Sequence, residues 1–129
     1  MQNIQQLIDI NFKYLGNWFF HNDELDNTIQ NTDITNFLYA FVIDDNIQYI
    51  GKSTQSIKKR FAGYKKPGKS QTTNIKNNKN IKDTLKNNQE IKIYIFNDNS
   101  PLRYGKFNIN LAAGLEDSLI NSIKPPWNG

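Results

Sequence analysis

Two tyrosines, one arginine and one carboxylate are the residues of this chain whose types and order suggest chemistry. Tyr39 and Tyr49 lie ten residues apart in an apolar segment, and Arg60 follows in a basic one. Glu116 lies much further along the chain. A carboxylate can hold a metal ion that stabilises developing charge, an arginine can neutralise a phosphate, and a tyrosine can transfer a proton if neighbouring cations lower its pKa. This set of groups suits the hydrolysis of a phosphodiester bond.

Most other catalytic and metal-binding constellations are absent from the sequence. The chain has no cysteine, which excludes disulfides and thiolate metal sites. His21 is the only histidine, which argues against His-based triads and His metal clusters. The glycines Gly51, Gly63 and Gly68 are isolated, so they do not form a glycine-rich loop of the kind that cradles phosphates.

Charge is strongly segregated along the 129 residues, although the formal net charge is only +4 at pH 7. Residues 1–51 contain seven acidic residues and one basic residue, Lys13. Residues 52–92 contain twelve basic and two acidic residues. The middle segment is therefore where a polyanion would bind, although a run of lysines is as often only a solvated surface.

The sequence pattern predicts that a β-hairpin positions the tyrosine pair. Leu38–Ile43 and Ile47–Ile50 are apolar and each has strand length, and Asp44-Asp45-Asn46 between them suits a tight turn. We therefore expect Tyr39 and Tyr49 to lie on paired strands, as neighbours across the ladder.

A basic helix is expected directly after the hairpin. Ser53 suits its N-cap, and Ile57, Phe61 and Tyr64 recur at helical spacing as one buried stripe. Pro67-Gly68 should end it.

The remaining segments complete an α+β pattern in a chain long enough for one modest core. We predict a small three-stranded antiparallel sheet flanked by helices, with an N-terminal arm. Residues 1–36 would be the arm and connector, and residues 37–129 the main domain. The further predicted elements are a short helix within residues 1–10, a strand or extended arm at 11–20, a polar connector at His21–Asn36, a helix at Thr73–Asn87, a strand at Ile91–Phe96 and a helix from Asn110 to Ile123, stopped by Pro125-Pro126.

Several short motifs in a fixed order carry a family resemblance. They are Phe12-Lys13-Tyr14, Leu38-Tyr39-Ala40, Tyr49-Ile50-Gly51-Lys52, Lys58-Lys59-Arg60, Glu116 and the ending Pro125-Pro126-Trp127-Asn128. The chain resembles the GIY-YIG nuclease family, and within it the branch of T-even phage endonuclease II and the small type II restriction endonucleases. The resemblance spans nearly the whole chain and implies that residues 37–129 form a GIY-YIG nuclease domain.

The resemblance implies a role for each candidate catalytic residue. Tyr39 would be the general base that activates water, and Tyr49 would help to hold its phenolate form, although which of the two takes the proton stays open. Arg60 would contact the scissile phosphate. Glu116 would hold a single divalent cation, Mg²⁺ or another such as Mn²⁺. Asn128 would orient a tyrosine or a phosphate by hydrogen bonding.

Two positions depart from the family pattern. Phe37 stands where the first motif has its glycine, which removes no catalytic group. Tyr64 stands one helical turn after Arg60, where many members carry a histidine, and it could hydrogen-bond a phosphate instead.

The basic segment would bind the partner that the resemblance implies, double-stranded DNA. Phosphate contacts of this kind give affinity but no sequence specificity. Lys13 is expected in an arm that clasps DNA or a neighbouring subunit. The lysines expected along the DNA backbone are Lys52, Lys65, Lys66, Lys69, Lys76 and Lys79.

The sequence therefore leads us to expect a Mg²⁺-dependent DNA endonuclease of the restriction or phage type. One active site cuts one strand, so a homodimer or homotetramer is expected. The N-terminus lacks a basic leader and no apolar run approaches the roughly 18 residues of a membrane span, so we expect a cytoplasmic protein without membrane contact. Two alternatives stay open: a catalytically inactive, basic nucleic-acid-binding protein, and a structure-specific repair or mobile-element nuclease.

Overall fold

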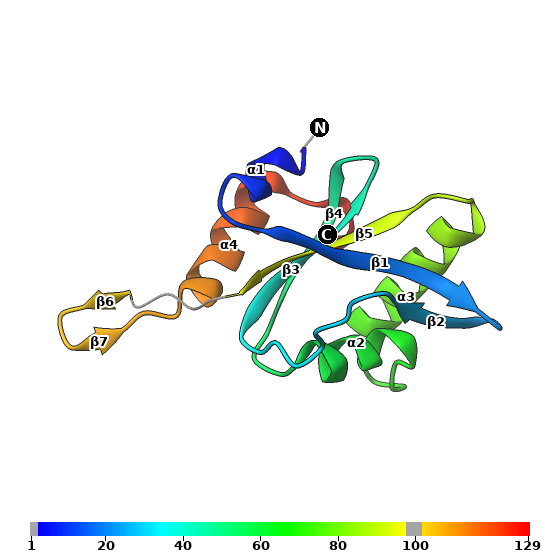
Figure 1. The fold of residues 1–129 in the computed structure, drawn as a ribbon, viewed down its shortest axis with the longest axis horizontal. Helices are drawn as coiled ribbons and strands as arrows, with labels where there is room; N and C mark the ends of the chain where they lie inside the picture. Colours follow the sequence, from blue (N-terminus) through cyan, green and yellow to red (C-terminus); the bar gives the residue numbers. More distant parts are fainter. Residues whose placement is uncertain (1–2, 98–101) are drawn as a thin grey trace.

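Five antiparallel strands form a single sheet through the middle of the molecule (Figure 1). The computed structural model describes residues 3–97 and 102–129. The strands lie in the order β2-β1-β5-β3-β4. Their bounds are Lys13–His21 for β1, Glu24–Asn27 for β2, Phe37–Ile43 for β3, Asn46–Ser53 for β4 and Ile91–Asn97 for β5.

The prediction of three strands was wrong, because the expected arm and connector contribute two more. β1 pairs along β5, and β2 folds back on β1 through a turn in which Asn22 and Asp23 have φ values of 51° and 61°. Trp18 and Leu25 from these strands are buried in the core. The division predicted at residue 36 thus falls between strands of one sheet.

The hairpin that carries the tyrosine pair is confirmed. Asp44 and Asp45 form its two-residue turn with φ values of 49° and 64°, a left-handed conformation that aspartate tolerates. The register pairs Tyr39 with Gly51 and Phe41 with Tyr49. The two tyrosines are therefore diagonal neighbours across the ladder on one face of the sheet, which agrees with the prediction that they lie near each other on paired strands.

Helices cover both faces of the sheet. α2 (Ile57–Lys65) and α3 (Thr72–Lys86) lie on one side, and α1 (Gln5–Ile8) and α4 (Leu111–Ile123) lie on the other (Figure 1). Because successive side chains of a strand point to opposite faces, β3 supplies Tyr39 and Phe41 to the α2–α3 side and Leu38 and Ala40 to the α1–α4 side.

Helix ends follow capping chemistry, with one correction. The N-cap of α2 is Ser56, whose Oγ accepts a hydrogen bond from the Lys59 amide at 3.2 Å, and not Ser53 as predicted. Ser53 is the last residue of β4. The predicted helices α3 and α4 and the predicted strand β5 are confirmed within a residue or two, and Asn110 caps α4.

Two elements were not predicted. A small hairpin of β6 (Arg103–Tyr104) and β7 (Phe107–Asn108) projects beyond the start of α4 (Figure 1). The expected C-terminal tail contains a short 3₁₀ helix, η1 (Pro126–Asn128), which packs against β4. Among the described residues, no helix combines the length and apolar character needed to cross a membrane.

Candidate active site

An aromatic cluster between the sheet and α2 forms the base of the candidate site. Tyr39 lies within it, with ring centroids 5.6 Å from Phe37, 5.4 Å from Phe41 and 5.2 Å from Phe61. The Tyr39 side chain is completely buried. Strand β3 and helix α2 bring these rings together because the apolar stripe of α2 faces the same side of the sheet as Tyr39.

A chain of short hydrogen bonds leads from this cluster toward the surface. The Tyr39 and Tyr64 hydroxyl oxygens are 2.6 Å apart, and Arg60 Nη2 donates to the Tyr64 hydroxyl at 2.6 Å. The Arg60 guanidinium carbon also lies 4.2 Å from the centre of the Tyr64 ring. Because Arg60 donates to the Tyr64 oxygen, the Tyr64 proton is free to point at Tyr39. The three residues thus form a connected proton-bearing unit.

Burial keeps both linked tyrosines protonated. Desolvation raises the pKa of Tyr39 and of Tyr64 well above the ordinary value of 10.0, and the nearby Arg60 charge only partly opposes this rise. The resting site therefore contains neutral phenols.

Tyr49 approaches the unit from the neighbouring strand. Its ring centroid lies 6.1 Å from that of Tyr39 and 5.7 Å from that of Phe41, on which it stacks. The Tyr49 side chain keeps 8% of its surface exposed, whereas Tyr39 keeps none. Solvent therefore reaches Tyr49 before it reaches Tyr39.

Tyr64 lies deeper in the molecule than the other residues that were predicted to contact DNA. We expected it among the residues that contact DNA, but its side chain is completely buried between Tyr39 and Arg60. Both hydrogen bonds of this hydroxyl are therefore internal, and Tyr64 belongs to the buried unit. Its contact with DNA stays a prediction.

Asn128 lies at the edge of the same sheet, where it binds the backbone of β4. Its Oδ1 accepts from the Ile50 amide at 2.9 Å, and its Nδ2 donates to the Ile50 carbonyl at 2.8 Å. Both polar groups of the side chain are therefore used next to Tyr49. Asn128 thus fixes the strand that carries Tyr49 and makes no hydrogen bond to either tyrosine's hydroxyl.

Glu116 lies on the other side of the sheet from Tyr39, in the layer of α1 and α4. It lies on α4, which packs on β4 and β3, and it is partly buried. Partial burial raises the pKa of the Glu116 carboxyl, while the nearby Lys52, one residue after Gly51, opposes that rise. The carboxylate therefore lies near Lys52 of the edge strand β4, and the Tyr39 hydroxyl of β3 lies against the neighbouring Gly51.

Glu116 would have to hold a metal ion without a large cluster of protein ligands. In the described part of the chain, no group of three or more His, Cys, Asp or Glu side chains is gathered for a metal. Mg²⁺ commonly binds through one or two carboxylates together with water and substrate phosphate. A single carboxylate at the edge of the site is compatible with that mode.

The predicted DNA-binding lysines have different surroundings. Lys65 forms an ion pair with Asp26 at 3.2 Å, and Lys79 forms one with Asp83 at 2.8 Å. Lys13 is exposed on β1, where it pairs with Ile95 and lines a separate cavity. The other predicted lysines, all exposed, are Lys52, Lys66, Lys69 and Lys76.

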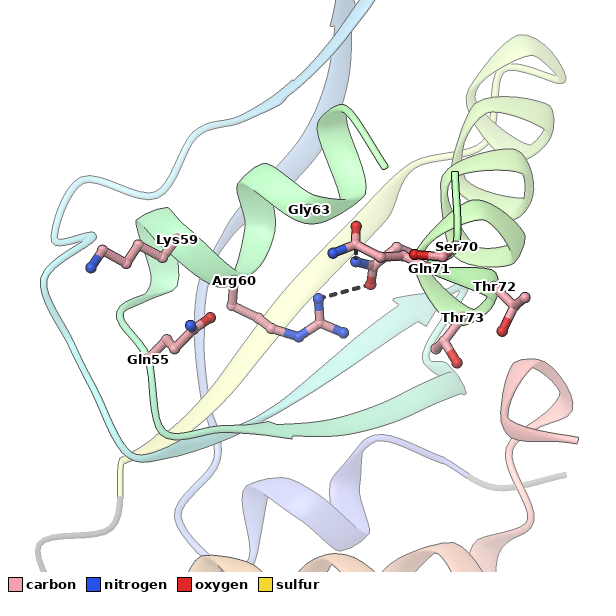
Figure 2. A pocket seen from close by; sticks show the side chains of 9 residues that line it. Gln55, Lys59, Arg60, Gly63, Ser70, Gln71, Thr72 and Thr73 are labelled. Carbon is pink, nitrogen blue, oxygen red and sulfur yellow. Dashed lines mark hydrogen bonds between the residues drawn. The ribbon is translucent and has the colours of Figure 1, made fainter. Parts of the chain in front are cut away.

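A polar cavity of about 490 Å³ opens beside Arg60, between α2 and the start of α3. We call it the Arg60 cavity; Figure 2 shows the Arg60 side chain reaching from α2 toward the segment of Ser70 and Gln71. Asn74, which was not among the residues predicted from the sequence, lines this cavity and accepts a hydrogen bond from Arg60 Nη1 at 2.9 Å. Its helical position gave no signal, since only the packing of α2 and α3 brings it to Arg60. The lining residues are Gln55, Lys59, Arg60, Gly63 and residues 70–74.

Comparison with known proteins identifies the fold. No protein-family model and no curated protein sequence matches the chain. Among solved structures, a mutant of bacteriophage T4 EndoII matches with 19% sequence identity and a TM-score of 0.76, covering 100% of both chains. The restriction endonuclease HPY188I in complex with product DNA matches with 22% identity and a TM-score of 0.55, over 96% of this chain and 86% of that chain. The resemblance inferred from the sequence is thus confirmed at the level of the fold.

Proposed function

We propose that this protein is a GIY-YIG endonuclease that hydrolyses phosphodiester bonds of double-stranded DNA with the help of a divalent cation. The observation that carries the proposal is the hydrogen-bonded unit of Tyr39, Tyr64 and Arg60 at the start of the basic segment. The shared fold supports it, since one structural neighbour is an EndoII and the other a restriction endonuclease in complex with product DNA.

Arg60 would bind the scissile phosphate and stabilise the negative charge that grows on it. Its guanidinium is fixed by two hydrogen bonds, so little reorganisation is needed when the phosphate binds. This preorganisation favours the transition state over the free substrate.

Tyr39 would take the proton from the attacking water. Its pKa is raised by burial, so only a small fraction is phenolate at neutral pH. Only the phenolate can take this proton, and two features favour that form: the Tyr64 hydroxyl can donate to the Tyr39 oxygen, and Arg60 polarises Tyr64 through its own hydrogen bond. Tyr49, which is less buried, would contact the water from its accessible side.

Glu116 would hold the divalent cation, Mg²⁺ or Mn²⁺, at the edge of β4. When bound, such an ion supplies Lewis-acid stabilisation of negative charge on phosphate oxygens. Asn128 would act as a positioning residue, because it fixes the backbone of Ile50 between Tyr49 and Gly51.

Double-strand cleavage would require more than one copy of the chain. Each chain contributes one set of Tyr39, Arg60 and Glu116, which suffices for one strand. We therefore propose a homodimer or homotetramer on DNA, with Lys13 of β1 near DNA or a neighbouring subunit.

Purified protein incubated with supercoiled plasmid and Mg²⁺ tests the proposal. We expect nicked and then linear DNA, no cleavage with a chelator in place of Mg²⁺, and loss of cleavage in Arg60→Ala with DNA binding retained. Sequencing of the cut ends separates two settings: discrete sites indicate a restriction enzyme, and loosely preferred sites indicate a phage-type nuclease. Binding without any cleavage would contradict the proposal and favour the inactive nucleic-acid-binding alternative.

A further inference from the structure

The Arg60 cavity is lined by cations and hydroxyl groups. Lys59 and Arg60 of α2 line it together with Ser70, Thr72 and Thr73, and Figure 2 shows Arg60 reaching toward the Ser70–Gln71 segment while Lys59 extends the other way. None of its nine lining residues is acidic. Such a lining attracts an anion and offers it hydrogen-bond donors.

Arg60 is held in this wall without losing its charge. Its guanidinium donates to two neutral acceptors, the Tyr64 hydroxyl at 2.6 Å and Asn74 Oδ1 at 2.9 Å. Within residues 3–97 and 102–129, the ion pairs join Lys65 to Asp26 and Lys79 to Asp83, and none involves Arg60. A guanidinium that is positioned but not neutralised keeps its full attraction for an incoming anion.

Asn74 is itself fixed in the orientation that this arrangement needs. Its Nδ2 donates to Gln71 Oε1 at 3.1 Å, which turns Oδ1 toward Arg60. Gln71 Oε1 also accepts from the Gly68 amide at 2.8 Å. A Cβ at Gly63 would lie 2.8 Å from Asn74 Nδ2. The absence of a side chain at Gly63 therefore leaves room for the side-chain amide of Asn74.

The cavity and the tyrosines lie on different sides of Arg60. Nη2 points to Tyr64 and, through it, to Tyr39, whereas Nη1 points to Asn74 and the cavity. An anion in the cavity would thus share the Arg60 charge without lying against the Tyr39 hydroxyl.

We propose that the Arg60 cavity binds a DNA backbone phosphate next to the scissile one, and that Asn74 is a positioning residue that orients Arg60 while leaving its charge free. This inference rests on the proposed nuclease function. Lys59, which also lines the cavity, adds positive charge at its edge, and the hydroxyls of Ser70 and Thr73 are available as donors.

Two matched pairs of variants test it, with binding to a short DNA duplex measured over a series of salt concentrations. Asn74→Asp keeps the shape of the amide but adds a carboxylate beside Arg60, and Asn80→Asp adds the same charge further along α3. Lys59→Gln removes a cation that lines the cavity, and Lys58→Gln removes its exposed neighbour outside it.

We expect Asn74→Asp to bind DNA about tenfold more weakly than Asn80→Asp, and its salt dependence to fall by about one released counterion. Lys59→Gln should release about one counterion fewer on binding DNA than Lys58→Gln does.

Equal DNA affinity and equal salt dependence within both pairs would overturn the inference. If the wild type cleaves DNA but the two variants of each pair bind DNA equally, phosphate binding in the Arg60 cavity is refuted and the nuclease proposal stands. Binding differences as expected without cleavage by the wild type would refute the nuclease proposal alone.

Discussion

The hydroxyl end of the Tyr39 ring lies directly over the Cα of Gly51. A Cβ added at Gly51 would approach Tyr39 Cζ and Oη to 2.4 Å, far closer than side chains tolerate. Gly51 is the cross-strand partner of Tyr39 in the β3–β4 hairpin. The glycine at this position is therefore required by the placement of the tyrosine, and it keeps the Tyr39 hydroxyl in reach of Tyr64.

Gly51→Ala should displace the Tyr39 ring. The ring is completely buried, so the overpacking should lower the free energy of unfolding by about 1–3 kcal/mol. A shift of the reacting group by roughly 1 Å should lower the cleavage rate on the order of 100-fold. Denaturant unfolding and plasmid cleavage measure the two effects. Gly114→Ala is the control, because nothing lies within 4 Å of a Cβ there, and it should stabilise α4 by about 0.5–1 kcal/mol with cleavage unchanged.

Tyr64→Phe should disconnect Arg60 from Tyr39. The ring and its packing stay, but the buried Tyr39 hydroxyl loses its 2.6 Å partner, which costs about 1–3 kcal/mol. We expect a cleavage rate on the order of 10–100-fold lower, as for the loss of an acid–base contribution. Cleavage by Tyr64→Phe at the wild-type rate, in a protein that folds normally, would refute a role for the unit.

Stability should fall at high pH because Tyr39 and Tyr64 are buried as neutral phenols. Their pKa is raised above 10.0 in the folded chain, so below 10.0 folded and unfolded chains both keep the protons and the stabilisation is fully present. Above 10.0 the unfolded chain releases protons that the folded chain retains. The free energy of unfolding should therefore drop by up to about 1.4 kcal/mol per pH unit for each tyrosine.

Urea unfolding at increasing pH measures this drop. Tyr64→Phe should make it shallower, whereas Tyr104→Phe should leave it unchanged because Tyr104 is 80% exposed. Identical alkaline slopes in the wild type and in Tyr64→Phe would be incompatible with a buried neutral phenol at position 64.

Asn128→Ala should loosen the edge strand β4. The change removes two hydrogen bonds to the Ile50 backbone, and each contributes about 0.5–1.5 kcal/mol. Hydrogen exchange of the Ile50 amide should become faster, and cleavage should weaken through the displaced Tyr49. Asn121→Ala, at an exposed position of α4, is the matched control. Unchanged exchange at Ile50 would show that the two hydrogen bonds do not persist in solution.

Local sequence patterns predicted the turns and helices correctly wherever a short segment determines its own structure. Asp44 and Asp45 predict their turn because aspartate tolerates positive φ, and the apolar stripe from Leu111 to Ile123 predicts α4. The same turn signal is present at Asn22-Asp23, and it would have revealed the β1–β2 hairpin within the supposed connector.

Long-range packing was beyond the reach of the sequence. β1 pairs with β5, which lies more than 70 residues away, and no local pattern specifies that partner. The diagonal placement of Tyr39 and Tyr49 depends on a register irregularity after Phe41. Asn74 reached Arg60 only through the packing of α3 on α2, and Tyr64, one helical turn after Arg60, met Tyr39 only through the packing of α2 on the sheet.

The most direct test of the nuclease account is Mg²⁺-dependent plasmid cleavage by Glu116→Gln beside Asp117→Asn. Burial disfavours the charged form of Glu116, so the neutral glutamine should not unfold the protein. The account predicts that Glu116→Gln binds DNA but loses cleavage by at least about 100-fold, because the metal ligand is gone. Asp117→Asn, which changes the exposed carboxylate next to it, should cleave like the wild type. Wild-type cleavage by Glu116→Gln would contradict the account.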